Sequence, residues 1–248
     1  MKKVSVCFIA NHNYFFSRHY LESIGYERKK KEVDFVVKDA PIEYVNTIGE
    51  IVIELIVIDY TKDQRTTDFF AGIADNYSNI QSDNVAKSIN NFLRIATGDL
   101  ICVVPSGVSL QTNWLTEVIY YNSNVENCGI IGIPTKFSNV EFLPLPSRES
   151  DNYINVFLPK DNTIQGIYCF DKQVLGLIGA LDESIDLSGN EMNQYCLRSA
   201  YSKFNNFYIP TQSSFSVNNE YVKGEKSDEN MKSTLKEMAS RRSFYIPL

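Results

Sequence analysis

Short apolar runs alternate along this chain with segments in which apolar residues recur at helical spacing. The continuous runs predict buried strands at residues 4–9, 33–37, 51–58, 100–104 and 128–133. The helical spacing predicts helices at residues 15–24, 67–74, 84–96 and 114–121. Because strands and helices alternate, the pattern predicts an α/β fold with a mainly parallel central sheet and helices on both faces. We expect Gly98 to end the helix at 84–96 in a left-handed conformation.

The pattern changes after residue 133. Residues 137–162 are rich in Pro, Ser and Asn, which predicts a segment that crosses the surface. Further on, the sequence predicts a strand at 165–170, a helix at 171–178, a tight turn at 179–183, a helix at 190–201 and a strand ending at residue 210. We therefore divide the chain into a domain at 1–215 and a tail at 216–248, in which residues 231–241 form a docking helix.

The net charge of the chain limits which kinds of molecule it can bind. The 248 residues carry a net charge of -6 and have a pI near 5.1. A general nucleic-acid binder needs a basic surface to neutralise phosphates, so this class is excluded. The only basic cluster, residues 28–31, is interpreted as a solvated loop. Contact with an anionic lipid or substrate is the alternative, and it would allow peripheral membrane association.

The five cysteines are widely spaced, lie mostly in apolar runs and form no CxxC pair. We expect them to be reduced core residues, and His12 and His19 are too few to suggest a structural zinc site. The first ten residues predict a strand and not a signal peptide, because Ser5 breaks the apolar run and no small-residue cleavage site follows. No window approaches the roughly 20 apolar residues of a membrane span. We expect a cytoplasmic protein.

Polar residues follow two of the predicted parallel strands. Asn11 comes after the first strand, which closes with Ile9 and Ala10, and Asp59 ends the strand at 51–58. In open parallel sheets, ligands bind outside the carboxyl ends of the strands. These residues therefore lie where a nucleotide would bind, although Asp59 has a second interpretation as the cap of the following turn.

The segment from residue 96 to residue 115 joins a helix end to a strand and then to another helix. It reads Ala96-Thr97-Gly98-Asp99, an apolar strand, Pro105-Ser106-Gly107 and then Trp114-Leu115. This frame resembles the GT-A glycosyltransferases of family 2, in which Ala-Thr-Gly-Asp leads into a strand that closes with Asp-x-Asp. Four more segments are similar to that family in the same order, so the resemblance covers about residues 4–215. These segments are 4–9, 54–59, 166–183 and 191–210.

The resemblance implies transfer of a sugar from a nucleotide sugar to a hydroxyl of a glycan, a lipid-linked acceptor or a protein. It implies nucleotide-sugar contacts at Ile9, Ala10, Asn11, Asp59, Asn90, Ser106 and Gly107. Acceptor contacts fall at Asp182 and Glu183, and Glu191 is the only acid left at the position of the family's base. Purely structural roles are the alternatives for three of these residues. Ser106 and Gly107 would form an inert turn, and Glu191 would stabilise a helix start.

The departures from the family concentrate at catalytic positions. Pro105-Ser106-Gly107 replaces the Asp-x-Asp whose carboxylates hold a divalent cation in the family. Met192 stands at the position of the general base, and Ile89 stands where the family has Arg before Asn90. The family's late His has no counterpart near Asn218. Because the metal-linked positions are changed together, we expect no divalent metal and no cofactor besides the donor substrate.

Two functions follow from these positions. The first is a glycosyltransferase of the hexosyltransferase type that works without a metal. The alternative is a catalytically inactive protein of the same fold that serves as a glycan-binding or partner-enzyme scaffold, as a homo-oligomer or with a partner transferase. A Rossmann-type dehydrogenase is disfavoured because no GxGxxG follows the first strand.

Overall fold

The computed structural model describes residues 3–11, 14–23, 26–29, 43–46, 51–80, 84–105, 108, 110, 114–133, 167–184 and 191–209. Its main sheet has seven strands in the order β5-β4-β1-β6-β8-β7-β9. All pairings in it are parallel except the two made by β8, so the sheet is mostly parallel. The strands are β1 (Lys3–Ala10), β4 (Val52–Asp59), β5 (Asn76–Asn79), β6 (Leu100–Pro105), β7 (Cys128–Ile133), β8 (Ile167–Asp171) and β9 (Asn205–Tyr208). A separate antiparallel pair consists of β2 (Tyr26–Lys29) and β3 (Glu43–Asn46).

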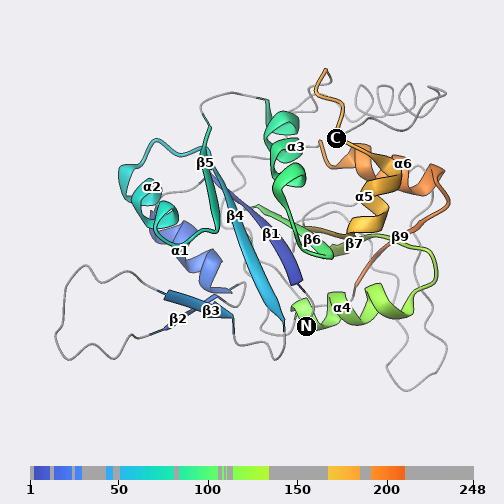
Figure 1. Ribbon diagram of the computed structural model, residues 1–248, viewed down its shortest axis with the longest axis horizontal. Coiled ribbons are helices and arrows are strands. Elements are labelled where there is room, and N and C mark those ends of the chain that lie inside the picture. The colour runs from blue at the N-terminus through green and yellow to red at the C-terminus, as the bar shows by residue number, and fades with distance from the viewer. Residues whose placement is uncertain are drawn as a thin grey trace.

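Helices cover both faces of the main sheet (Figure 1). One face packs on α1 (Tyr14–Ser23), α2 (Gln64–Ala71) and α4 (Trp114–Asn124), whose buried side chains include Leu21, Phe70 and Trp114. The other face packs on α3 (Val85–Ile95), α5 (Lys172–Ile178) and α6 (Asn193–Tyr201). Alternate residues of β1 explain the two cores, because Phe8 packs into the first and Cys7 into the second. The predicted three-layer α/β architecture is confirmed.

The predicted elements are found with shifted ends. Helix α2 begins three residues before the predicted start at 67, because Asp63 caps it: the Asp63 Oδ1 accepts from Arg65 N at 3.2 Å. Helix α6 begins at Asn193 and not at residue 190. The edge strand β5 was not predicted, since its sequence NYSN is polar and mostly exposed. The expected elements at 33–37, 137–162 and 216–248 lie outside the described residues.

The cysteines agree with the prediction of reduced core residues. All five are free, and four of them are buried. Cys128 is the half-buried one. Burial raises the pKa of the Cys128 thiol to about 12, so this thiol stays protonated at neutral pH.

The prediction for Gly98 is wrong. Helix α3 ends at Ile95, Ala96 is extended, and Gly98 does not have a positive φ. The glycine is required by close packing instead. A Cβ at this position would lie 2.5 Å from Ser5 N and 2.7 Å from Ser5 Oγ, and the Gly98 N–H donates to that same Oγ at 2.8 Å. Any side chain would push the segment before β6 away from β1.

Gly98→Ala is therefore expected to lower the free energy of unfolding by about 2 kcal/mol, the usual effect of overpacking against main chain. Gly176→Ala is the matched control, because a Cβ at Gly176 in α5 meets nothing within 4 Å. That helical substitution should stabilise the protein by up to about 1 kcal/mol. Urea unfolding of both variants is the measurement. Equal stability of the two variants would refute the packing argument.

Candidate functional site

The order of strands in the main sheet reverses between β1 and β6. Strands β4 and β5 extend from one side of β1, and β6 lies on the other side, with Ile9 of β1 opposite Pro105 of β6. Ligands of open α/β sheets bind at such a switch point, outside the carboxyl ends of the strands. Ile9 and Asn11 are half-buried there, and Ala10 is buried. Ser106 and Gly107 come next after β6 and lie outside the described residues. We call the group Ile9, Ala10, Asn11 and Asp59 the strand-end site.

Asp59 ends β4 beside Ala10 and is completely buried. Its Oδ1 accepts from Thr61 N at 2.7 Å. Its Oδ2 accepts from the hydroxyl of Tyr77 at 2.7 Å, from Thr67 Oγ1 at 3.3 Å and, at 3.5 Å, from an amide of β5. The carboxylate thus ties the turn after β4 to α2 and to β5. These contacts are those expected if Asp59 caps the turn that follows β4.

Further hydrogen bonds join this turn to the segment after β1. The Tyr60 N–H donates to Ala10 O at 2.8 Å. The Asp63 Oδ2 accepts from Tyr14 N at 3.2 Å and from Thr66 Oγ1 at 2.9 Å. These hydrogen bonds to Asp63 lower the pKa of its carboxyl group. The two loops that border the strand-end site are therefore held together before any ligand binds.

Glu191 lies just before α6 and is only 4% exposed. The neighbouring Met192, at the family's base position, is buried in the core beneath α6. Burial raises the pKa of Tyr60, which follows β4, and the carboxylate of Glu191 adds to that rise. The same two causes act on Tyr168 in β8. Glu191 therefore lies near two tyrosines that the sequence analysis did not assign to the site; their places beside strand ends were the available signal.

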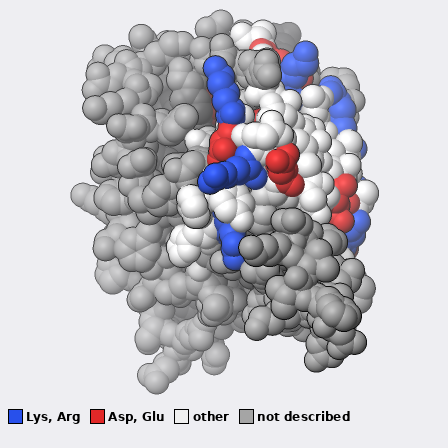
Figure 2. Space-filling model, turned by 90° about the vertical axis from the view of Figure 1, so that its left-hand side faces the viewer, with Lys and Arg blue, Asp and Glu red and all other residues white. Residues whose placement is uncertain are grey.

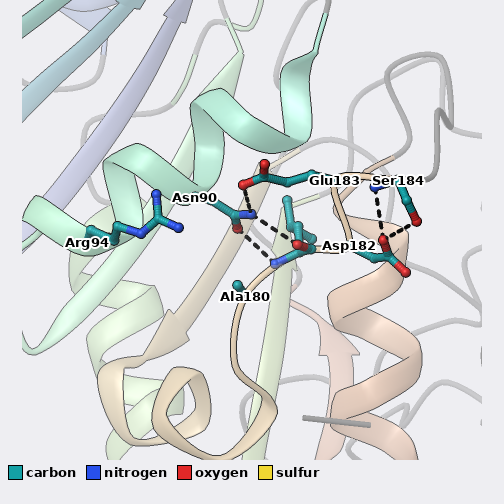
Figure 3. A pocket seen from close by; sticks show the side chains of 7 residues that line it. Asn90, Arg94, Ala180, Asp182, Glu183 and Ser184 are labelled. Carbon is teal, nitrogen blue, oxygen red and sulfur yellow. Dashed lines mark hydrogen bonds between the residues drawn. The ribbon is translucent and has the colours of Figure 1, made fainter. Parts of the chain in front are cut away.

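Asn90 in α3 does not join the strand-end site. Its side chain is 1% exposed and is bonded at both ends: Leu181 N donates to Asn90 Oδ1 at 2.8 Å, and Asn90 Nδ2 donates to Leu181 O at 3.0 Å. The same Nδ2 lies 2.9 Å from Glu183 Oε1. The structure thus brings Asn90 together with Asp182 and Glu183, which the sequence analysis assigned to a different ligand (Figure 3).

A cavity of about 320 Å³ opens at this junction, and we call it the α3 pocket. Its lining residues are Asn90, Arg94, Ala180, Leu181, Asp182, Glu183 and Ser184. Figure 3 shows the guanidinium of Arg94 to the left of Asn90 and the carboxylate of Glu183 above the Asn90 amide. The sequence analysis missed Arg94, although its position four residues after Asn90 places both on one face of a helix.

The described residues do not fit a divalent cation. No group of three or more His, Cys, Asp or Glu side chains among them could hold a metal ion. At the strand-end site the one carboxylate, Asp59, is taken up by protein donors, and β6 closes with Pro105, which offers no side-chain ligand.

Charged side chains are mixed on the surface. On the face shown in Figure 2, Lys and Arg lie interspersed with Asp and Glu among the described residues. On this face the described residues form no large patch that is purely positive or purely negative. None of the helices described is long and apolar enough to pass through a membrane.

No family model and no curated protein matches the sequence. Solved structures do match. TarS 1–349 from S. aureus in complex with UDP-GlcNAc is 14% identical with a TM-score of 0.60, over 96% of this chain and 65% of that chain. Mannosyltransferase PcManGT from Pyrobaculum calidifontis in complex with GDP-Man and Mn2+ is 13% identical with a TM-score of 0.57, over 88% and 57%.

The catalytic domain of Drosophila β1,4-galactosyltransferase 7 in complex with xylobiose is 12% identical with a TM-score of 0.54, over 100% of this chain and 83% of that chain. The chain thus spans less than two thirds of the length of the TarS and mannosyltransferase structures. At these identities the likeness shows the fold.

Proposed function

This chain has the GT-A fold of glycosyltransferases, and from that premise we propose that it transfers a sugar from a nucleotide sugar to a hydroxyl of a glycan, a lipid-linked acceptor or a protein. The observation that carries the proposal is the strand-end site at the reversal of strand order in such a sheet. Two structures of similar fold hold UDP-GlcNAc and GDP-Man. Fold alone does not fix function, so the proposal rests on the residues of the site.

We assign the roles of those residues as follows. Ile9, Ala10 and Asn11 contact the nucleotide at the carboxyl end of β1. Asp59 shapes the turn beside it, and Ser106 with Gly107 offers a hydroxyl and main-chain N–H groups to the diphosphate. Glu191 accepts the proton of the acceptor hydroxyl. Because Asp182 and Glu183 line the α3 pocket, we retain them as acceptor contacts.

Charge on the leaving diphosphate must be stabilised without the family's paired carboxylates and their cation. Pro105 ends β6 where an acidic pair would be needed. Hydrogen-bond donors that are fixed in advance, such as the hydroxyl of Ser106, helix N-termini and basic side chains, can stabilise developing negative charge in their place. The proposed transferase is therefore independent of a divalent metal.

The second candidate function is a glycan-binding or partner-enzyme scaffold without catalysis. Two observations favour it. Met192 occupies the base position and is buried in the core, and the carboxylate of Asp59 is bound by protein donors. Under this alternative the strand-end site binds no nucleotide. A nucleotide-binding experiment therefore distinguishes the scaffold from the transferase.

The remaining parts of the proposal concern the whole chain. We assign residues 1–215 to one GT-A domain and residues 216–248 to a tail with a docking helix. We place the protein in the cytoplasm, with peripheral contact to a membrane where the acceptor is lipid-linked. A second copy or a partner transferase would complete the assembly.

The test is calorimetric titration of the full chain with UDP, GDP, CDP, dTDP and their common sugar conjugates, each with and without manganese. We expect one nucleotide and its sugar conjugate to bind, with an affinity that manganese leaves unchanged. A tenfold gain with manganese, about 1.4 kcal/mol, would contradict the metal-independent mechanism. Absence of binding by every nucleotide would favour the scaffold.

A further inference from the structure

Arg94 and Glu183 flank the α3 pocket without pairing with each other. The only ion pair between described residues is Lys3–Glu54, so these two opposite charges lie more than 4.0 Å apart. We propose that the α3 pocket binds one neutral sugar residue of the acceptor, held between the Arg94 guanidinium and the Glu183 carboxylate. This inference rests on the proposed function for the identity of the ligand as an acceptor.

Both groups have hydrogen-bonding capacity to spare. Within the described part of the chain, Arg94 donates only from Nη1, to Asn91 Oδ1 at 2.9 Å, which leaves its Nε–H and Nη2 available. Glu183 accepts only at Oε1, from Asn90 Nδ2, which leaves Oε2 available. Both residues are exposed. A ligand in the pocket would therefore meet donors on one side and an acceptor on the other.

The floor of the pocket is fixed in advance. The paired hydrogen bonds between Asn90 and Leu181 hold α3 against residues 180–184. Gln194 of α6 holds the same segment, because its Oε1 accepts from Asp182 N at 2.7 Å and its Nε2 donates to Asp182 O at 3.2 Å. Asp182 in turn accepts from Ser184 N at 2.9 Å. Such a floor loses little conformational freedom when a ligand binds.

The same contacts connect the pocket to the proposed catalytic carboxylate. The Gln194 N–H donates to Glu191 O at 3.1 Å, so one helical turn separates the residue that fixes Asp182 from Glu191. At the other end, Asn84 Nδ2 donates to Glu183 O at 3.1 Å and joins the segment to the start of α3. An acceptor sugar in the pocket would thus be held on the same rigid elements that carry Glu191.

The charge around the pocket is mixed. Arg94 and Glu183 carry opposite charges in the lining, and the carboxylate of Asp182 interacts electrostatically with Arg198, so a phosphate or carboxylate ligand would meet no excess of positive charge. A sugar carries hydroxyls that both donate and accept, and neighbouring hydroxyls can bind a carboxylate oxygen on one side and a guanidinium on the other. A volume of about 320 Å³ accommodates a single small ligand.

The experiment is an NMR titration of the 15N-labelled full chain with the methyl glycosides of glucose, galactose, mannose and N-acetylglucosamine, and separately with glycine. We expect at least one glycoside to shift the amide signals of residues 180–184 and the Nε–H signal of Arg94. Glu183→Gln keeps an oxygen for Asn90 but removes the charge, and Arg94→Met keeps the aliphatic stem. Each should weaken binding at least about fivefold, as loss of a charge-assisted hydrogen bond predicts.

Arg65→Met is the control, since Arg65 is an exposed arginine on α2, which packs on the opposite face of the sheet. It should bind the glycoside as the unmodified chain does. The proposal is overturned if no glycoside shifts these signals, if both pocket variants bind normally, or if glycine binds in place of the sugars. Nucleotide titration of the same samples tests the proposed function separately. Glycoside binding without nucleotide binding would remove the transferase and leave the sugar pocket in place.

Discussion

Glu54→Ala is expected to lower the free energy of unfolding by about 3 kcal/mol, because it leaves several hydrogen-bond donors inside the protein without their acceptor. Glu54 is 6% exposed in the middle of the sheet. Its Oε2 accepts from Thr97 N at 2.8 Å and from the Ser5 hydroxyl, and its Oε1 accepts from Thr97 Oγ1 at 2.6 Å. Lys3 Nζ lies 3.0 Å from Oε1, but it is 41% exposed and contributes less. The alanine variant would leave the Ser5 hydroxyl and Thr97 N–H without their acceptor.

The same hydrogen bonds make the free energy of unfolding depend on pH in the acid range. Burial alone would raise the pKa of Glu54, but the hydrogen bonds from Ser5, Thr97 and Lys3 outweigh it and lower the pKa from 4.5 to about 2. A lowered pKa in the folded protein means that the stabilisation is complete above the unfolded value near 4.5. It is lost as the pH falls toward 2, by about 3 kcal/mol in total.

Urea unfolding between about pH 6 and pH 2 measures this dependence. The Glu54→Ala variant should lack the acid dependence that comes from Glu54. The difference in free energy of unfolding between the variant and the unmodified chain should therefore shrink as the pH falls. Glu126→Ala removes an exposed glutamate from the turn before β7 and is the control, expected to change stability by less than about 0.5 kcal/mol. A Glu54→Ala curve parallel to that of the unmodified chain would show that Glu54 does not carry the effect.

The sequence predicted the order of elements well, because buried strands and amphipathic helices leave a local periodic record. The runs at 4–9, 51–58, 100–104 and 128–133 are β1, β4, β6 and β7. Strand β5 left no such record, since its residues are mostly exposed at a sheet edge. Gly98 was misread for a related reason. Its neighbour across the sheet is Ser5, and a contact between residues so far apart in the chain has no local pattern.

The candidate site was predicted in part. The positions of Ile9, Ala10 and Asn11 followed from the rule that ligands bind at strand ends. The grouping of Asn90 with Glu183 did not, because it depends on a hydrogen bond between residues 93 positions apart. The sequence analysis favoured the nucleotide role of Asp59 and kept turn capping as a second interpretation. The donors Tyr77 and Thr67 leave no local sequence signal, since they reach Asp59 only after β5 and α2 have packed.

Asp59→Ala is expected to abolish measurable nucleotide binding and to lower the free energy of unfolding by about 3 kcal/mol. The reason is the number of groups that share this one buried carboxylate. Removing it leaves the Tyr77 hydroxyl and the Thr61 N–H, both of half-buried residues, without their acceptor, at about 1–3 kcal/mol for each group. The turn that borders Ala10 would then lose its fixed conformation.

Two further variants separate a positioning role from direct contact with the base. Tyr77→Phe removes one hydrogen bond to Asp59 Oδ2 and leaves the carboxylate in place. Asp59→Asn keeps an oxygen that can accept from Thr61 N but loses the charge. If Asp59 acts by positioning, nucleotide affinity and stability should fall together in both variants.

Direct contact with the base predicts a different pattern. Asp59→Asn would then lose affinity with little loss of stability, and Tyr77→Phe would lose stability with affinity retained. We expect the first pattern, because every oxygen of the carboxylate already has a protein donor and the residue is completely buried. Titration with the nucleotide that binds the unmodified chain, together with urea unfolding, measures both quantities on the same samples. If the first pattern is observed, Asp59 acts on the nucleotide through the main chain that it holds. Its negative charge then stabilises the turn after β4 and does not bind the base directly.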